Sequence, residues 1–85
     1  MSHFTTPDFW DCCNALPKEV RTLADKNYDL LQANLNHPSL HFRRIKADVW
    51  SICVGIHCRA LAFEESDGFS WFWIGPHTEY DKLIA

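Results

Sequence analysis

The stretch VWSICVGIHCRALAF, residues 49–63, carries two runs of β-branched, aromatic and aliphatic residues on either side of Gly55. Such runs around a glycine are typical of a β-hairpin, because glycine adopts the positive φ that a tight turn requires. We therefore predict strands over residues 49–54 and 58–63, joined by a two-residue type II′ turn at Gly55 and Ile56.

This turn determines which side chains lie opposite one another. It places Cys53 beside Cys58 and Ile52 beside Arg59, and opposed side chains share a face of the sheet. The two thiols either close a disulfide under oxidation or, in a reducing compartment, serve as small apolar core residues. Arg59 is expected to need an anionic partner there, either a substrate phosphate or an internal carboxylate. The apolar residues predicted to share its face are Trp50, Ile52, Leu61 and Phe63.

The remaining segments alternate between helical and strand patterns. Thr6 and Pro7 suit the start of a first helix, and apolar residues recur at helical spacing from Val20 to Leu35. The run FSWFWI, residues 69–74, has no polar alternation, so both of its faces should be covered. The predicted elements are a very short strand at residues 3–5, helices at 7–14 and 17–35, strands at 40–45 and 69–74, and a closing helix at 78–84. This order indicates an α+β domain of two layers.

Composition limits the classes of protein that the sequence fits. Its 85 residues suffice for one domain, residues 1–85, and 47% of them are hydrophobic. Eight Lys and Arg against eleven Asp and Glu give a net charge of −3, so any contact with nucleic acid must come from a local basic patch. There is neither an apolar run long enough for a membrane helix nor a signal peptide, so we expect a cytoplasmic protein with reduced cysteines and no membrane partner.

The one dense basic segment is HFRRIK, residues 41–46. In a regular strand, Arg44 and Lys46 face one side and Arg43 faces the other. These residues either hold phosphates by charge or belong to a solvated edge strand whose basic side chains discourage aggregation.

A third candidate cluster follows the last predicted strand. His77 and Tyr80 are three residues apart, which places both on one side of a helical turn. A histidine exchanges protons near neutral pH and a tyrosine can orient it, although ordinary helices also carry such pairs. The cysteines show no C-x-x-C spacing, and we expect neither a metal nor any other cofactor.

Taken together, the segments FWDCCNALPKEVRTLADKNYDLL, HPSLHFRRI, VWSICVGIHCRALAF and FSWFWIGPHTEYDKLI resemble the RelE/ParE family of type II toxins. The resemblance covers nearly the whole chain from Phe9 onward. It implies a RelE/ParE-like fold, with an N-terminal helical hairpin packed on a roughly four-stranded antiparallel sheet and a short C-terminal helix. For the RelE-like branch it also implies metal-independent cleavage of mRNA on the ribosome, held in check by a cognate antitoxin protein.

The resemblance assigns a role to each candidate residue. Arg59 would stabilise the phosphate as the 2′-hydroxyl attacks it, His77 would supply a proton, and Tyr80 would orient the phosphate or assist proton transfer. The residues that would hold the RNA backbone are Arg43, Arg44 and Lys46. The chain departs from the pattern at Cys53, where relatives commonly carry a second arginine, and at Cys58, where they carry tyrosine. Two alternatives remain open, a ParE-like poison of DNA gyrase and a catalytically inactive domain that binds other proteins.

Overall fold

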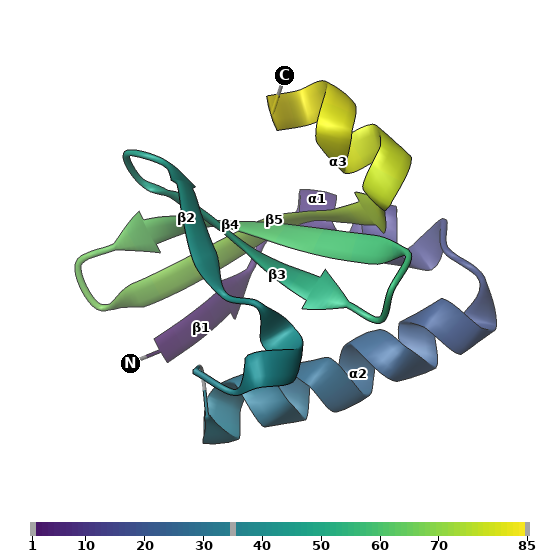
Figure 1. Ribbon diagram of the computed structural model, residues 1–85, viewed down its shortest axis with the longest axis horizontal. Coiled ribbons are helices and arrows are strands. Elements are labelled where there is room, and N and C mark those ends of the chain that lie inside the picture. Colours follow the sequence, from purple (N-terminus) through teal and green to yellow (C-terminus); the bar gives the residue numbers. More distant parts are fainter. Residues whose placement is uncertain (1, 35, 85) are drawn as a thin grey trace.

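The computed structural model describes residues 2–34 and 36–84, which form one mixed sheet flanked by helices on both faces (Figure 1). The elements in chain order are β1 (Ser2–Thr5), α1 (Pro7–Asn14), α2 (Lys18–Ala33), a 3₁₀ turn (Pro38–Leu40), β2 (Arg43–Lys46), β3 (Val49–Val54), β4 (Cys58–Glu65), β5 (Gly68–Pro76) and α3 (His77–Ile84).

The sheet has five strands in the order β1-β5-β4-β3-β2. The four strands β2 to β5 form the predicted antiparallel meander, but β1 pairs with β5 in parallel, so the expectation of a purely antiparallel, roughly four-stranded sheet was wrong. The short N-terminal strand covers backbone groups of β5 that would otherwise stay unpaired. The α+β class is confirmed, whereas the two-layer arrangement is not, because α3 lies across the sheet from α2 (Figure 1).

Both N-terminal helices begin at the predicted signals. The Thr6 side chain accepts a hydrogen bond from the Phe9 amide at 3.2 Å, which caps α1 just before Pro7. Pro17 immediately precedes α2, which ends at Ala33. Leu35, the predicted last residue of this helix, lies outside the described residues.

The strand predicted over residues 40–45 begins later, at Arg43. Residues Pro38–Leu40 form the 3₁₀ turn, in which the His37 imidazole accepts a hydrogen bond from the Ser39 amide at 3.2 Å. His41 then adopts the left-handed conformation with φ 47°, which redirects the chain into β2.

The β3–β4 hairpin has a three-residue loop instead of the predicted two-residue turn. Val54 pairs with Cys58, Cys53 with Arg59, and Ile52 with Ala60, a shift of one residue from the predicted register. Because strand side chains alternate between faces, this shift puts Arg59 on the face of Cys53 and not on that of Ile52 and Trp50.

The same shift removes the predicted pairing of Cys53 with Cys58, and both thiols are free. Cys58 belongs to the core beneath α2. Burial raises the pKa of its thiol, which keeps the group protonated and apolar.

The run at residues 69–74 lies between β1 and β4, and α1 and α3 both contact its strand, β5. A β-bulge interrupts the pairing, since Leu61 is opposite Trp73 while Ala62 is opposite Trp71. Phe72 is therefore the extra residue, and its ring stacks on that of Phe63 with centroids 4.3 Å apart. Contacts with both α1 and α3 explain why this strand lacks alternation between polar and apolar residues.

Within the part of the chain that the structure describes, no helix has the length and apolar character needed to cross a membrane.

We predict that His3 makes stability depend on pH. Its Nδ1 accepts a hydrogen bond from the Trp71 indole at 3.1 Å, and burial lowers the pKa of His3 below its usual value. A group whose pKa falls on folding stabilises the protein above the unfolded-state pKa, about 6.5, and this contribution is lost as the pH falls through the folded-state pKa. Urea unfolding should show the stability advantage of wild type over His3→Gln shrinking between about pH 7.5 and 5.5. An advantage that is independent of pH would contradict this.

Candidate functional site

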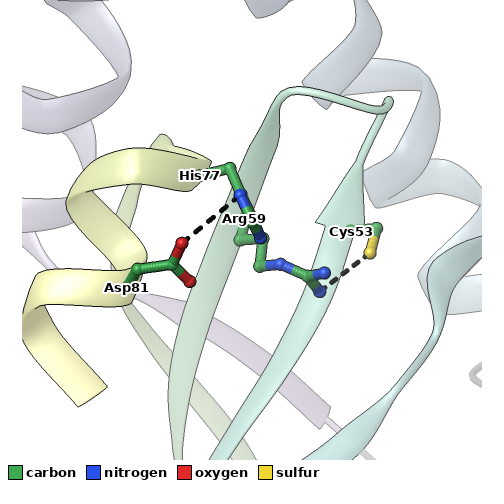
Figure 2. A network of polar contacts seen from close by, with 4 residues as sticks. All are labelled: Cys53, Arg59, His77 and Asp81. Carbon is green, nitrogen blue, oxygen red and sulfur yellow. Dashed lines mark hydrogen bonds and ion pairs between the residues drawn. The ribbon is translucent and has the colours of Figure 1, made fainter. Parts of the chain in front are cut away.

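Arg59 lies near the start of β4, opposite Cys53 on β3 and Gly75 on β5. Its Nη1 donates a hydrogen bond to Cys53 Sγ at 3.0 Å (Figure 2). Its Cζ lies 5.0 Å from the centroid of the Tyr80 ring, which α3 supplies. A Cβ atom added at Gly75 would lie 2.6 Å from the Trp73 ring, so the strand beside Arg59 has room only for glycine.

The guanidinium of Arg59 has no carboxylate partner among residues 2–34 and 36–84, where the ion pairs are His77–Asp81 and Lys82–Glu79. Its Nε is buried without a hydrogen-bond partner in the same part of the chain. A half-buried cation of this kind retains its charge and several donor directions for an external anion. The sequence left two anionic partners open for Arg59, a substrate phosphate and an internal carboxylate. Among the described residues, no carboxylate pairs with Arg59.

His77 is the first residue of α3, and its backbone amide donates to the His57 carbonyl at 2.7 Å. Its imidazole stacks on the Tyr80 ring with centroids 6.1 Å apart. Since the Arg59 guanidinium lies over that same ring, Tyr80 contacts both of the other residues expected to act in catalysis. The His77 side chain is 49% exposed, so it can meet a bound molecule.

Tyr80 is 1% exposed, and its hydroxyl is buried without a hydrogen-bond partner among the described residues. The hydroxyl therefore does not reach solvent, and contact with a substrate phosphate through this atom requires α3 to move. In the observed arrangement Tyr80 contributes its ring, which supports Arg59 and His77.

Asp81 belongs to the same group of side chains and was missed by the sequence reasoning. Its Oδ2 lies 3.6 Å from Nδ1 of His77 (Figure 2). A carboxylate beside one ring nitrogen orients an imidazole. The spacing of four residues on a predicted helix was the available signal.

The basic residues of β2 divide between the two faces of the sheet in a way the sequence did not predict. Arg43 pairs with Ser51 and Lys46 with Val49, which places both on the Arg59 face, while Arg44 pairs with Trp50 on the other face.

The prediction that Arg44 and Lys46 share a side was wrong, because the strand register shifts between them. Arg44 instead donates through Nε to the Ala47 carbonyl at 3.0 Å and lies 5.9 Å from the Trp50 ring centroid. These contacts give Arg44 a local structural role at the β2–β3 turn.

Within the described ranges, no group of three or more His, Cys, Asp or Glu side chains is arranged to hold a metal ion.

No protein family model matches this chain, and no curated protein matches it. Its fold is similar to that of a solved chain in the RelB–RelE antitoxin–toxin complex from Methanococcus jannaschii, with a TM-score of 0.76 and 15% sequence identity. The alignment covers 96% of this chain and 99% of the other. The likeness covers nearly the whole chain and is one of fold.

We predict that Tyr80 tolerates loss of its hydroxyl but not of its ring. Removing a buried, unpaired hydroxyl relieves a desolvation cost of about 1–3 kcal/mol, so Tyr80→Phe should leave the free energy of unfolding unchanged or raise it. Tyr80→Ala should lower it by about 3–5 kcal/mol, as for other large aromatic core residues. Urea unfolding measures both variants, and a Tyr80→Phe loss as large as that of Tyr80→Ala would contradict the orphaned hydroxyl.

Proposed function

We propose that this chain is the toxin of a toxin–antitoxin pair, a RelE-like endoribonuclease that cleaves mRNA on the ribosome. The observation that carries the proposal is that one ring, that of Tyr80, contacts both the guanidinium of Arg59, which has no carboxylate partner among the described residues, and the exposed imidazole of His77. A fixed cation next to an acid–base group is the arrangement that phosphodiester cleavage needs when charge develops on the phosphate.

The build of this chain, and not the fold comparison, favours the role of toxin over that of antitoxin. The similar chain belongs to a complex of an antitoxin with a toxin, and this chain builds its own sheet and buried core. Antitoxins of this kind are typically partly disordered and fold over their partner. A chain with its own α+β core and a cationic site fits the toxin, which is the component that an antitoxin inhibits.

In the proposed reaction, the 2′-hydroxyl oxygen bonds to the adjacent phosphorus as the bond to the 5′-oxygen breaks. Arg59 stabilises the negative charge that builds on the phosphate oxygens. Protonated His77 gives its proton to the leaving 5′-oxygen, and the proton of the attacking hydroxyl passes to water. Asp81 orients the imidazole, while Tyr80 positions both Arg59 and His77 through its ring.

This mechanism needs the 2′-hydroxyl as nucleophile, which makes RNA the substrate and DNA a non-substrate. It assigns backbone binding to Arg43 and Lys46, which share the face of Arg59, and removes Arg44 from that role. The net charge of −3 gives little general attraction to RNA. A ribosome that presents the mRNA would supply the affinity that this chain lacks.

We predict that mRNA cleavage depends on Arg59 and His77. Arg59→Gln should lower cleavage by about 10²–10³-fold and His77→Ala by about 10²–10⁴-fold, because each removes a contact made to the reacting atoms. Asp81→Asn should cause a smaller loss, since it acts through His77. The measurement is a map of new mRNA 5′ ends in cells that express each variant.

Arg21→Gln is the matched control, because it removes the same charge from an exposed position on α2. It should cleave as wild type does. Broken DNA or altered plasmid supercoiling that persists in His77→Ala would favour a gyrase poison instead. The absence of any growth effect from wild type would favour an inactive protein-binding domain.

We also predict that the two faces of β2 behave differently. The double variant Arg43→Ala, Lys46→Ala should reduce association with ribosomes and make it less sensitive to salt, with little change in folding. Arg44→Ala should instead lower the free energy of unfolding by about 1 kcal/mol through loss of its carbonyl and indole contacts. Sedimentation with ribosomes and urea unfolding separate the two effects. Equal loss of ribosome association in Arg44→Ala would contradict the division.

A further inference from the structure

An open depression lies where the β3–β4 hairpin approaches α2. It is lined by Leu23, Asn27, Ser39, His41, Cys53, Gly55 and Ile56. Strand β2 pairs with β3 only as far as Ser51, and Cys53, which lies beyond this pairing, lines the depression. None of these seven residues is acidic, although the chain has eleven Asp and Glu.

Resting on the proposed function, we propose that this depression binds one unpaired base of the RNA whose phosphate lies at Arg59. Cys53 connects the two places, because it lines the depression and accepts the Arg59 hydrogen bond at 3.0 Å. A ribose joins each base to its phosphate, so a base held here places a phosphate within the reach of the guanidinium.

The lining suits the two chemical aspects of a base. Leu23 is 37% exposed and Ile56 is 89% exposed, and these side chains offer apolar surface to the flat face of a ring. Asn27 and His41 carry donors and acceptors that can pair with the polar edge of the ring. An unpaired base presents both aspects at once, and the absence of acidic side chains avoids repulsion of the attached phosphates.

Close contacts support two sides of the depression. A Cβ atom added at Gly55 would lie 2.5 Å from Leu23 Cδ2, and Gly55 has φ +67°, so glycine lets the hairpin pack against α2. On the other side, Ser39 Oγ is 2.8 Å from His37 Nδ1, and His41 is held in the left-handed region at the end of the 3₁₀ turn. A preformed pocket loses less entropy when it orders a nucleotide.

The probes for a test are four 2′-O-methyl RNA tetranucleotides of uniform base, in which the blocked 2′-oxygen prevents cleavage. Titrations followed by backbone amide NMR on the full chain give affinities up to millimolar concentrations. Wild type should prefer the best base over the worst by about fivefold or more. The amides of Asn27, His41 and Ile56 should shift on binding.

Asn27→Ala and His41→Gly should each reduce this preference to about twofold or less, because they remove hydrogen bonds to the base edge. Glycine keeps the left-handed backbone at residue 41, and alanine is a good helix former at residue 27. Gln32→Ala is the matched control, since it removes an exposed amide from α2 outside the depression and should leave the preference intact. Arg59→Gln should weaken all four oligonucleotides equally.

Equal affinities for the four bases, no binding at millimolar RNA, or an unchanged preference in both depression variants would overturn the proposal. A different result would contradict the proposed nuclease function, namely the absence of new mRNA ends in cells that express wild type. Base preference without cleavage would therefore leave the depression as a nucleotide site in a protein that is not a nuclease. Cleavage without base preference would support the catalytic roles of Arg59 and His77 and contradict base binding in the depression.

Discussion

The Arg59 guanidinium lies against the ring of Tyr80 with Cζ 5.0 Å from its centroid, and a thiol accepts its Nη1 hydrogen bond at 3.0 Å. Neither partner is a carboxylate, so the side chain is held in place while its charge stays available to a ligand. The contact requires α3 to start directly after β5 and to fold over this face of the sheet. The position of the last helix and the chemistry of the strand arginine therefore depend on one interaction.

Much of the fold is encoded locally and could be predicted from the sequence. Thr6 and Pro7 specify the start of α1, and the apolar runs around Gly55 specify β3 and β4, because capping and strand patterns act within a few residues. The length of the hairpin loop was not predictable in this way. It depends on how Gly55 packs against Leu23, a contact between segments about thirty residues apart in the chain. The one-residue error then changed the predicted neighbours of Arg59.

The candidate site shows the same division between local and distant causes. His77 and Tyr80 were predicted to share one side of a helical turn, and the same spacing rule points to Asp81. The contact between Tyr80 and Arg59 depends on which face of the sheet α3 covers, and no local sequence pattern predicts that face. The shift in register between Arg44 and Lys46 is likewise invisible in the sequence, and it alone decides which basic side chains share the Arg59 face.

The distribution of charge answers the objection that an acidic chain should repel RNA. The acidic turn at residues 64–67 lies at the opposite end of β4 from Arg59. Glu65 lies six positions along the strand from Arg59, which is roughly 20 Å at about 3.3 Å per residue. Interactions between exposed charges are screened over about 8 Å at physiological salt, so this turn has little effect on the potential at Arg59. Two carboxylates of α3 lie close to nitrogen-bearing side chains, Asp81 to His77 and Glu79 to Lys82, each at 3.6 Å. The charges close to Arg59, more than the net charge of −3, therefore determine whether a phosphate can approach Arg59.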